Sequence, residues 1–331
     1  MGTAARRAPS NRYGVGVNEG DVVTEQPGGV VQPPRPRRSV SPGVLAPALA
    51  AIVSLLLIVI TWRLLVTTRR GQLVEEAARI GSQGARESLS DLTALMLGVV
   101  SVPFLVIVVA AAVLVALAQK RWSIAIAVIV VIVGANLTTQ MLQSVLVRPV
   151  EDASTIANNS FPSGHATVAA SIAAAALLVL PVRWRPPVAV LGALLSASMG
   201  ISTMIGTEVG AWHRGSDVVA AMLIATLWYF LAESVLAGLA HANGESRSGG
   251  NPPRAFVKVP LAILTVLGTL SLALGVGALA ATAVRAPITT DLGHQVAFLG
   301  SAAGVAAVAC YTQAMMLRLR PHHPKPQSEP L

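Results

Sequence analysis

The sequence is short of charged residues and holds a single cysteine. Only 12% of its 331 residues are charged and 53% are hydrophobic, whereas a soluble globular domain carries about 25% charged residues. A chain this apolar cannot bury its side chains in one core surrounded by water. The lone Cys310 excludes a disulfide framework and a thiolate metal cage. These shortages indicate an integral membrane protein whose main solvent is the bilayer.

The basic residues that are present are grouped. A formal net charge of +9 can accompany nucleic-acid binding, but here the lysines and arginines stand in short clusters between apolar runs. That pattern orients helices in a membrane. About two thirds of these residues lie in the terminal segments and in alternate loops. The asymmetry predicts a multi-pass protein of the cell membrane with both termini in the cytoplasm and no nucleic-acid partner.

Eight apolar segments approach the length needed to cross the membrane, about 20 residues for roughly 30 Å of hydrocarbon. The stretch between the first two, about 70–90, has mixed charges and helical composition, and we expect it to form an outer-surface helix covering the mouth of the protein. The expected fold is an all-α polytopic transmembrane helix bundle. The apolar segments lie near 43–66, 92–118, 123–146, 165–182, 188–206, 217–239, 259–283 and 295–316.

The segments divide the chain into five expected parts. The last two spans follow a Gly/Ser/Pro-rich stretch typical of a flexible linker, so we expect an accessory hairpin, in which Gly300-x-x-x-Gly304 allows close helix packing. The parts are a disordered basic cytoplasmic tail (1–42), a six-span membrane domain (43–239), a cytoplasmic linker (240–258), two accessory transmembrane helices (259–316) and a cytoplasmic tail (317–331).

Three places combine charge with turn-forming residues at the predicted outer end of a span. Ionisable groups at the membrane cost energy unless they are paired or used. Singly, each place has a structural explanation: a snorkelling arginine, a turn with a helix cap, or a surface ion pair. Together, on one side and at one depth, they favour a shared site. They are Arg148-Pro149, Pro162-Ser163-Gly164-His165 and the stretch 210–217, which ends in His213-Arg214-Gly215-Ser216-Asp217.

Each of these pieces suits a phosphate group. Ser163 is a good N-cap, and the unpaired amides of the helix start that follows form an anion site. Arg148 offers a planar donor fork for phosphoryl oxygens. His213 and Asp217 are four residues apart and share a helical face, so Asp217 can accept one imidazole N–H and leave the other nitrogen free to attack. His165 can protonate a leaving group.

The motif order resembles the type 2 phosphatidic acid phosphatase superfamily of membrane lipid phosphatases, whose pattern is K-x6-R-P, P-S-G-H and S-R-x5-H-x3-D. The similarity covers about residues 92–238. It implies a six-helix core, no metal or other cofactor, and a phosphohistidine intermediate. By motif position it implies His213 as nucleophile, Asp217 as its partner, His165 as general acid, and Arg148, Ser163 and Gly164 as phosphate-binding residues.

Two positions depart from the family pattern. Met141 stands where the family has its lysine, and seven residues on a helix place it on the face of Arg148. Gly206-Thr207 stands where the family has serine-arginine. Arg214 can return one positive charge and Thr207 a hydroxyl, so both join the expected phosphate-binding residues. Gln140 or Gln143 can act as neutral donors, and the sequence does not choose among these replacements.

The resemblance implies a hydrolase for a lipid phosphate or pyrophosphate, acting on the outer face of the membrane. Membrane lipids and a lipid or isoprenoid phosphate substrate are the implied partners, and an acceptor other than water would make the protein a phosphotransferase. The missing cations motivate an alternative: a catalytically weakened relative that binds or transfers phospholipid or isoprenoid-phosphate headgroups. A transporter ranks last, because the spans have almost no charge in their middle.

Overall fold

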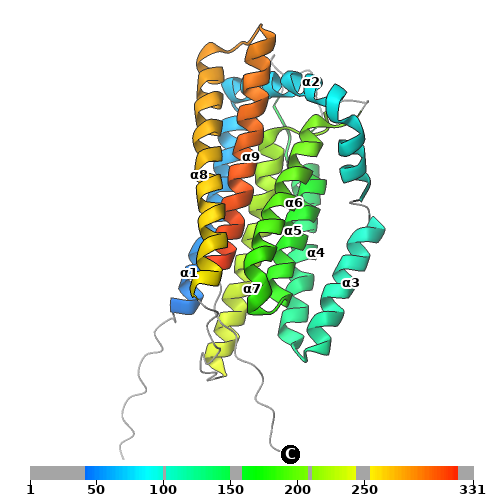
Figure 1. Cartoon of the computed structure of the whole chain (residues 1–331), viewed down its shortest axis with the longest axis vertical. Coiled ribbons are helices and arrows are strands. Elements are labelled where there is room, and N and C mark those ends of the chain that lie inside the picture. Colours follow the sequence, from blue (N-terminus) through cyan, green and yellow to red (C-terminus); the bar gives the residue numbers. More distant parts are fainter. Residues whose placement is uncertain (1–41, 100–101, 150–158, 208–210, 244–253, 320–331) are drawn as a thin grey trace, which may run out of the picture. The chain divides into compact units, whose positions relative to one another are not determined.

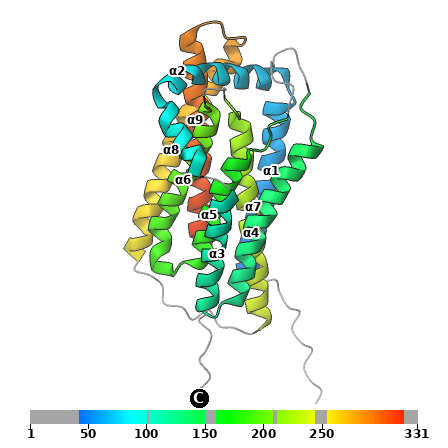
Figure 2. The ribbon, with the colours of Figure 1, turned by 90° about the vertical axis from the view of Figure 1, so that its right-hand side faces the viewer.

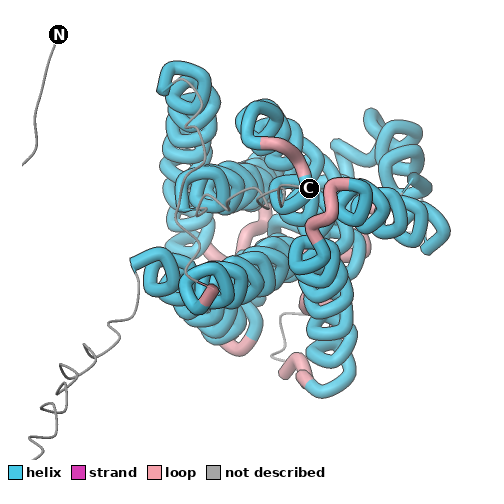
Figure 3. The backbone as a smooth tube through the Cα atoms, turned by 90° about the horizontal axis from the view of Figure 1, so that it is seen from below, coloured by secondary structure: helices cyan, strands magenta, loops and turns pink. Residues whose placement is uncertain are grey.

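The computed structural model describes residues 42–99, 102–149, 159–207, 211–243 and 254–319, and these ranges are helical without a β-strand (Figure 3). The fold class predicted from composition is therefore confirmed as all-α. The helices are α1 Pro42–Thr61, extended by a π-helical turn Trp62–Val66, α2 Arg69–Val99, α3 Val102–Ala118, α4 Trp122–Val145, α5 Gly164–Val179, a 3-10 turn Val182–Trp184, α6 Arg185–Ile205, α7 Gly215–Ala242, α8 Arg254–Arg285 and α9 Asp291–Leu319. The predicted tails and most of the predicted linker lie outside the described residues.

Within the described ranges, six helical segments are long and apolar enough to cross a membrane, which is the composition of a multi-pass membrane protein. Two further apolar helices, Val106–Ala118 and Gly164–Val179, are shorter. α1 begins and α9 ends at one end of the helices, and the first half of α2 lies at the other (Figure 1). The six segments are Gly43–Val66, Trp122–Val145, Val182–Ile205, Gly215–Ala242, Phe256–Arg285 and Asp291–Leu319.

The predicted second span, 92–118, falls on two described helices. Its first residues complete α2, which runs to Val99, and α3 begins at Val102, while 100–101 lie outside the described residues. The predicted surface helix at about 70–90 is present, but it continues as one 31-residue helix into the second apolar segment.

α2 lies across the ends of the other helices with its first half and descends beside α6 with its second (Figure 2). Two side chains of α2 cap the end of α6: Arg86 Nε donates to Ile205 O at 2.9 Å, and Thr93 Oγ1 donates to Gly206 O at 3.1 Å. The positive charge of Arg86 suits the negative end of the α6 dipole. α2 is thereby fixed where α6 ends.

α5 and α7 lie at the centre of the described helices. α5 packs against α4, α6 and α7, and α7 also packs against α1 and α9. The buried positions of α5 are mostly alanines, which let neighbouring backbones approach closely. The acid Glu233 of α7 is also buried and has an interaction within the protein.

α8 packs mainly against α9, but α9 itself also packs against α2, α6 and α7. The last helix therefore belongs to the core of the described residues, whereas we expected the last pair to be an accessory hairpin. The predicted close approach is present: a Cβ on Gly275 of α8 would lie 2.9 Å from the backbone nitrogen of Gly304 and 3.1 Å from Gly300 O. Only glycine fits at this contact.

We predict that Gly275→Leu separates α8 from α9 and lowers stability by about 1–3 kcal/mol, the usual cost of overpacking. Thermal unfolding of the detergent-solubilised protein measures the change. Gly277→Leu is the matched control, because a Cβ there has no atom within 4 Å. Equal melting temperatures for the two variants would contradict the close contact.

Candidate functional site

The three places predicted to share a site do meet. They lie at the end of α4, at the turn before α5 and at the start of α7, and α2 adds a fourth element. Arg148 Nη2 lies 2.8 Å from Asp217 Oδ1, and Ser160 Oγ donates to Asp217 Oδ2 at 2.6 Å. The site is thus built from segments that are distant in sequence.

Hydrogen bonds to the backbone fix the turn before α5. Asn159 Nδ2 donates to Leu146 O at 3.0 Å, beyond the end of α4, and Gln143 Nε2 donates to Pro162 O at 2.6 Å. Ser163 N donates to Asp217 O at 2.9 Å, which ties the start of α5 to that of α7. The predicted N-cap is present, since Ser163 Oγ accepts from Ala166 N. Gln143 therefore supports the turn.

Asp217 is the centre of this network. Its side chain is fully buried and accepts from Arg148 Nη2, Ser160 Oγ and Arg214 N, the last at 3.0 Å. A buried carboxylate is stable only when charges and donors surround it. Asp217 thus holds the three segments together besides lying next to His213.

His213 is oriented through one ring nitrogen. Its Nδ1 lies 3.0 Å from Ser160 O and 3.5 Å from Asp217 Oδ2. A carbonyl and a carboxylate both accept hydrogen bonds, so Nδ1 carries the proton and Nε2 of the neutral ring keeps a lone pair. The expected Asp217 partner is close, but the shorter contact is to the backbone of Ser160. The geometry leaves Nε2 as a nucleophile or a base.

His165 lies on the first turn of α5, beside the His213 segment. Its ring centroid is 5.5 Å from that of Trp212, the residue before His213. A Cβ on Gly164 would have no atom within 4 Å, so there is open space beside the first amides of α5. His165 thus lies next to the His213 segment, at a helix N-terminus with open space beside it.

Arg148 is 3% exposed and lies between two carboxylates. Besides the Asp217 contact, its Nη1 is 3.5 Å from Glu75 Oε2 of α2. Among the described residues, Nε and Nη1 have no hydrogen-bond partner. The two carboxylates therefore balance the positive charge of the guanidinium, while its Nε and Nη1 make no hydrogen bond within the described residues.

Glu75 and Glu76 of α2 are site residues that the motif analysis missed. Glu75 Oε1 accepts from Ser216 N at 2.9 Å, at the N-terminus of α7, where a helix favours an anion. Burial raises the pKa of Glu75, as does the Asp217 charge, while Arg148 opposes the shift. The sequence did carry a signal, since Gln72, Glu75 and Glu76 share one helical face among apolar neighbours.

Arg214 is buried, and its Nη2 lies 3.8 Å from Glu76 Oε2. Burial lowers the pKa of the Arg214 guanidinium, and the charge of Arg148 lowers it further, whereas the three acids raise it. The guanidinium groups of Arg148 and Arg214 therefore lie among the same acids. Thr207 follows the end of α6 and is partly buried.

Met141 does not share a face with Arg148. α4 ends at Val145 and Leu146 is extended, because Pro149 disfavours helical backbone just before it. Met141 is 64% exposed while Arg148 is 3% exposed. The expectation from helical spacing was wrong, and Gln140 lies on the outer surface of α4 beside Met141.

The described residues contain no group of three or more histidine, cysteine, aspartate or glutamate side chains placed to hold a metal ion. Fold and site define a helical membrane protein with a buried network of charges and histidines at one end of its helices. Comparison with protein-family models, with curated proteins and with solved structures gave no match.

The raised pKa of Glu75 predicts a pH-dependent stability. Above the ordinary value of 4.5 the unfolded state releases the Glu75 proton first, so this residue lowers stability as pH rises towards its folded pKa, by at most about 1.4 kcal/mol per pH unit. Glu75→Gln removes this contribution. Between pH 4.5 and the folded pKa of Glu75, the stability of the variant relative to wild type should therefore rise with pH. Denaturant unfolding in detergent at several pH values measures the difference. Glu87→Gln, an exposed acid on the same helix, should show no such trend.

Proposed function

We propose that this protein is a member of the type 2 phosphatidic acid phosphatase superfamily: an integral membrane hydrolase for lipid phosphates or pyrophosphates, acting on the outer face of the membrane. The observation that carries the proposal is the orientation of the His213 ring. Its Nδ1 faces two acceptors, at 3.0 and 3.5 Å, which leaves Nε2 with a lone pair. His165 and the N-terminus of α5 are nearby. The motif order supports the same assignment.

In the proposed reaction, His213 Nε2 forms a bond to phosphorus while the bond from phosphorus to the leaving oxygen breaks. Protonated His165 gives its proton to that oxygen. Water then attacks phosphorus and transfers a proton to His165, and the nitrogen–phosphorus bond breaks to release inorganic phosphate. Arg148, Arg214, the Thr207 hydroxyl and the amides of Gly164 and His165 stabilise the charge on the phosphoryl oxygens. The Ser163 amide does not take part, because it donates to the Asp217 carbonyl; Ser163 acts as the cap of the helix start.

The substrate class follows from the membrane. A lipid tail stays in the bilayer while the headgroup reaches the network at the helix ends. Isoprenoid pyrophosphates, phosphatidic acid and phosphatidylglycerol phosphate are the substrates that the resemblance implies. No cofactor is required, since the attacking, protonating and charge-stabilising groups are all side chains or amides of this chain.

A second function is favoured by the charge balance of the site. Arg148 faces Glu75 and Asp217, so its charge is already neutralised. Arg214 shares Glu76 with Arg79, which binds that carboxylate at 2.6 Å. Met141 and Thr207 replace two family cations. A site of this kind binds a phosphate dianion less strongly than one with free cations. The alternative is a catalytically weakened relative that binds or transfers lipid-phosphate headgroups.

Phosphate release separates the two functions. Wild type should release phosphate from a short prenyl diphosphate, His213→Ala should release none above background, and His165→Ala should be slower by roughly 10²–10⁴-fold. Brief incubation with radiolabelled substrate should leave an acid-labile label on wild type and none on His213→Ala. His241→Ala, an exposed residue in the last turn of α7, is the control. Equal phosphate release by wild type and His213→Ala would refute the proposed hydrolase activity.

Glu75 should compete with phosphate for Arg148. Glu75→Gln removes the competing charge, and one charge-assisted hydrogen bond contributes about 1.5–3 kcal/mol, so inorganic phosphate should bind roughly tenfold or more tightly. Calorimetric titration of the detergent-solubilised protein measures this affinity whether or not the protein turns over. Glu87→Gln again serves as control. Weaker phosphate binding by Glu75→Gln would mean that the acid supports the anion site.

A further inference from the structure

A small cavity lies beside Glu75. It is lined by α2, by the start of α7, by α8 and α9, and by the π-helical turn that follows α1. Its volume is about 50 Å³, and a water molecule occupies roughly 30 Å³ in the liquid, so the cavity has room for water. Its polar side chains are those of Glu75, Ser216 and Ser301, and its other lining residues are apolar or glycine. A buried acid therefore borders a water-sized space.

Within the described residues, the Glu75 carboxylate accepts a hydrogen bond at one oxygen only. Oε1 accepts from Ser216 N at 2.9 Å, whereas Oε2 has no donor and lies 3.5 Å from Arg148 Nη1. Burial favours the neutral form of a carboxyl group, and hydrogen bonds to the charged form oppose this effect. Oε2 is thus an oxygen to which a proton can be added without the loss of a hydrogen bond.

The neighbouring acids have more hydrogen bonds than Glu75. The Asp217 carboxylate accepts three, as described above. Arg79 donates to both oxygens of Glu76, and its Nη2 lies 2.6 Å from Glu76 Oε1. Protonation of either acid would weaken these bonds. Glu75 is therefore the carboxyl group of this network where a proton binds at the least cost.

The charged groups that face Glu75 come from its own helix and from two other segments. Glu76 is its neighbour on α2, Arg148 belongs to the segment after α4, and Arg214 and Asp217 lie at the start of α7. Burial raises the pKa of Glu75, as does the Asp217 charge, while the two arginines lower it. α8, α9 and the π-helical turn contribute no charged side chain to the cavity.

The ion pairs of this network are balanced in charge without a ligand. Its carboxylates are Glu75, Glu76 and Asp217, and its guanidinium groups are Arg79, Arg148 and Arg214. A dianion that binds to Arg148 adds negative charge near Glu75. A like charge within about 4–6 Å favours the neutral form of an acid. Anion binding and protonation of Glu75 therefore favour each other.

We propose that Glu75 binds a proton when a tetrahedral dianion, such as a phosphate group, enters the site. The proton comes from the solution by way of the cavity and is added to Oε2. Glu75 becomes neutral, so Arg148 Nη1 leaves its ion pair and donates to the anion. The assignment of the anion as a lipid headgroup rests on the proposed function, but the proton site does not require hydrolysis.

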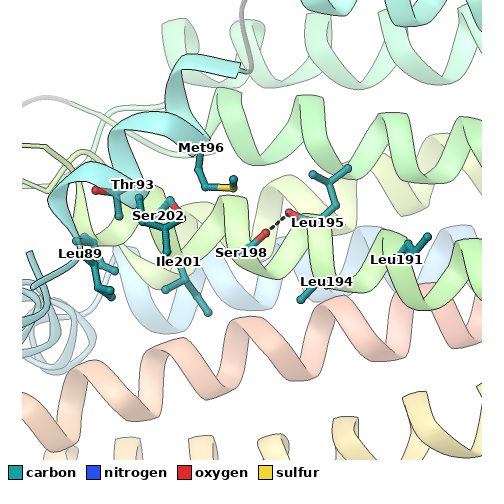
Figure 4. A pocket seen from close by; sticks show the side chains of 11 residues that line it. Leu89, Thr93, Met96, Leu191, Leu194, Leu195, Ser198, Ile201 and Ser202 are labelled. Carbon is teal, nitrogen blue, oxygen red and sulfur yellow. Dashed lines mark hydrogen bonds between the residues drawn. The ribbon is translucent and has the colours of Figure 1, made fainter.

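A second space beside α2 has no acid in its lining. The groove of about 520 Å³ between the second half of α2 and α6 is lined by apolar and hydroxyl side chains (Figure 4). Ser198 Oγ donates to Leu195 O at 3.2 Å, and Thr93 Oγ1 donates to Gly206 O. The proton site therefore belongs to the first half of α2, and Glu87, an exposed acid of the second half, is a matched control.

The test is a calorimetric titration of the detergent-solubilised protein with sulfate, in buffers of different ionisation enthalpy and at several pH values. Sulfate stays a dianion throughout, so any proton taken up binds to the protein. Wild type should take up as much as about one proton more per sulfate than Glu75→Gln. By linkage, its affinity for sulfate relative to that of Glu75→Gln should then fall by as much as about tenfold per pH unit as pH rises. Glu87→Gln should match wild type.

The subtraction removes protons taken up by His165 or His213, which both proteins retain. Equal uptake by wild type and Glu75→Gln at every pH would overturn the proposal, and so would failure of both proteins to bind sulfate. Repeating the subtraction with a short-chain alkyl phosphonate distinguishes the sources of the anion. Extra uptake with both ligands supports a headgroup, and extra uptake with sulfate alone supports a site for free anions.

A second measurement needs no variant. Infrared difference spectra of wild type should show the C=O band of a protonated carboxylic acid when sulfate binds, and isotopic labelling of glutamate at its side-chain carboxyl carbon should shift that band. Absence of the band, or a band that labelled glutamate does not shift, would contradict the assignment. If wild type and His213→Ala release phosphate equally while the band is present, the proposed hydrolase fails and the proton site stands.

Discussion

The buried ion pair between Arg148 and Asp217 is the interaction on which the site depends. It joins the segment after α4 to the first turn of α7, and Ser160 and Glu75 bring in the turn before α5 and the helix α2. Each partner would be costly to bury alone. The same contacts that make the buried charges tolerable also bring His213 and His165 to one region, so the stability and the chemistry of this end of the protein share one set of residues.

The sequence predicted the parts of the fold that follow from composition and short spacing. Of the eight apolar runs, six correspond to helices long and apolar enough to cross a membrane and two to shorter apolar helices, and Ser163 marked the start of α5. Prediction failed where a proline redirected the chain: Pro149 ends helical backbone before Arg148, which removes Met141 from the site. Helical spacing puts two residues on one face only along an unbroken helix, and α4 ends between these two.

For the site, motif spacing brought together Arg148, Ser163, His165, His213 and Asp217, but it gave no account of Glu75 and Glu76. Those acids lie in a segment with no motif. Their shared helical face indicates burial, but their place in the site depends on how α2 crosses the ends of the other helices (Figure 2). Their effect is electrostatic. The motifs alone predict a strongly cationic site at this end of the protein. With Glu75 and Glu76 present, Arg148 and Arg214 each lie near a carboxylate of α2.

α2 has a further consequence for how a ligand arrives. A side chain at Gly81 would clash with the carbonyl of His294 on α9, and one at Gly71 with the backbone at Leu64 and Leu65, so the helix is pressed onto its neighbours at two points. Swinging upward as a hinged cover would open both contacts. For a lipid of the proposed kind, sideways diffusion within the plane of the bilayer is a route that leaves α2 seated.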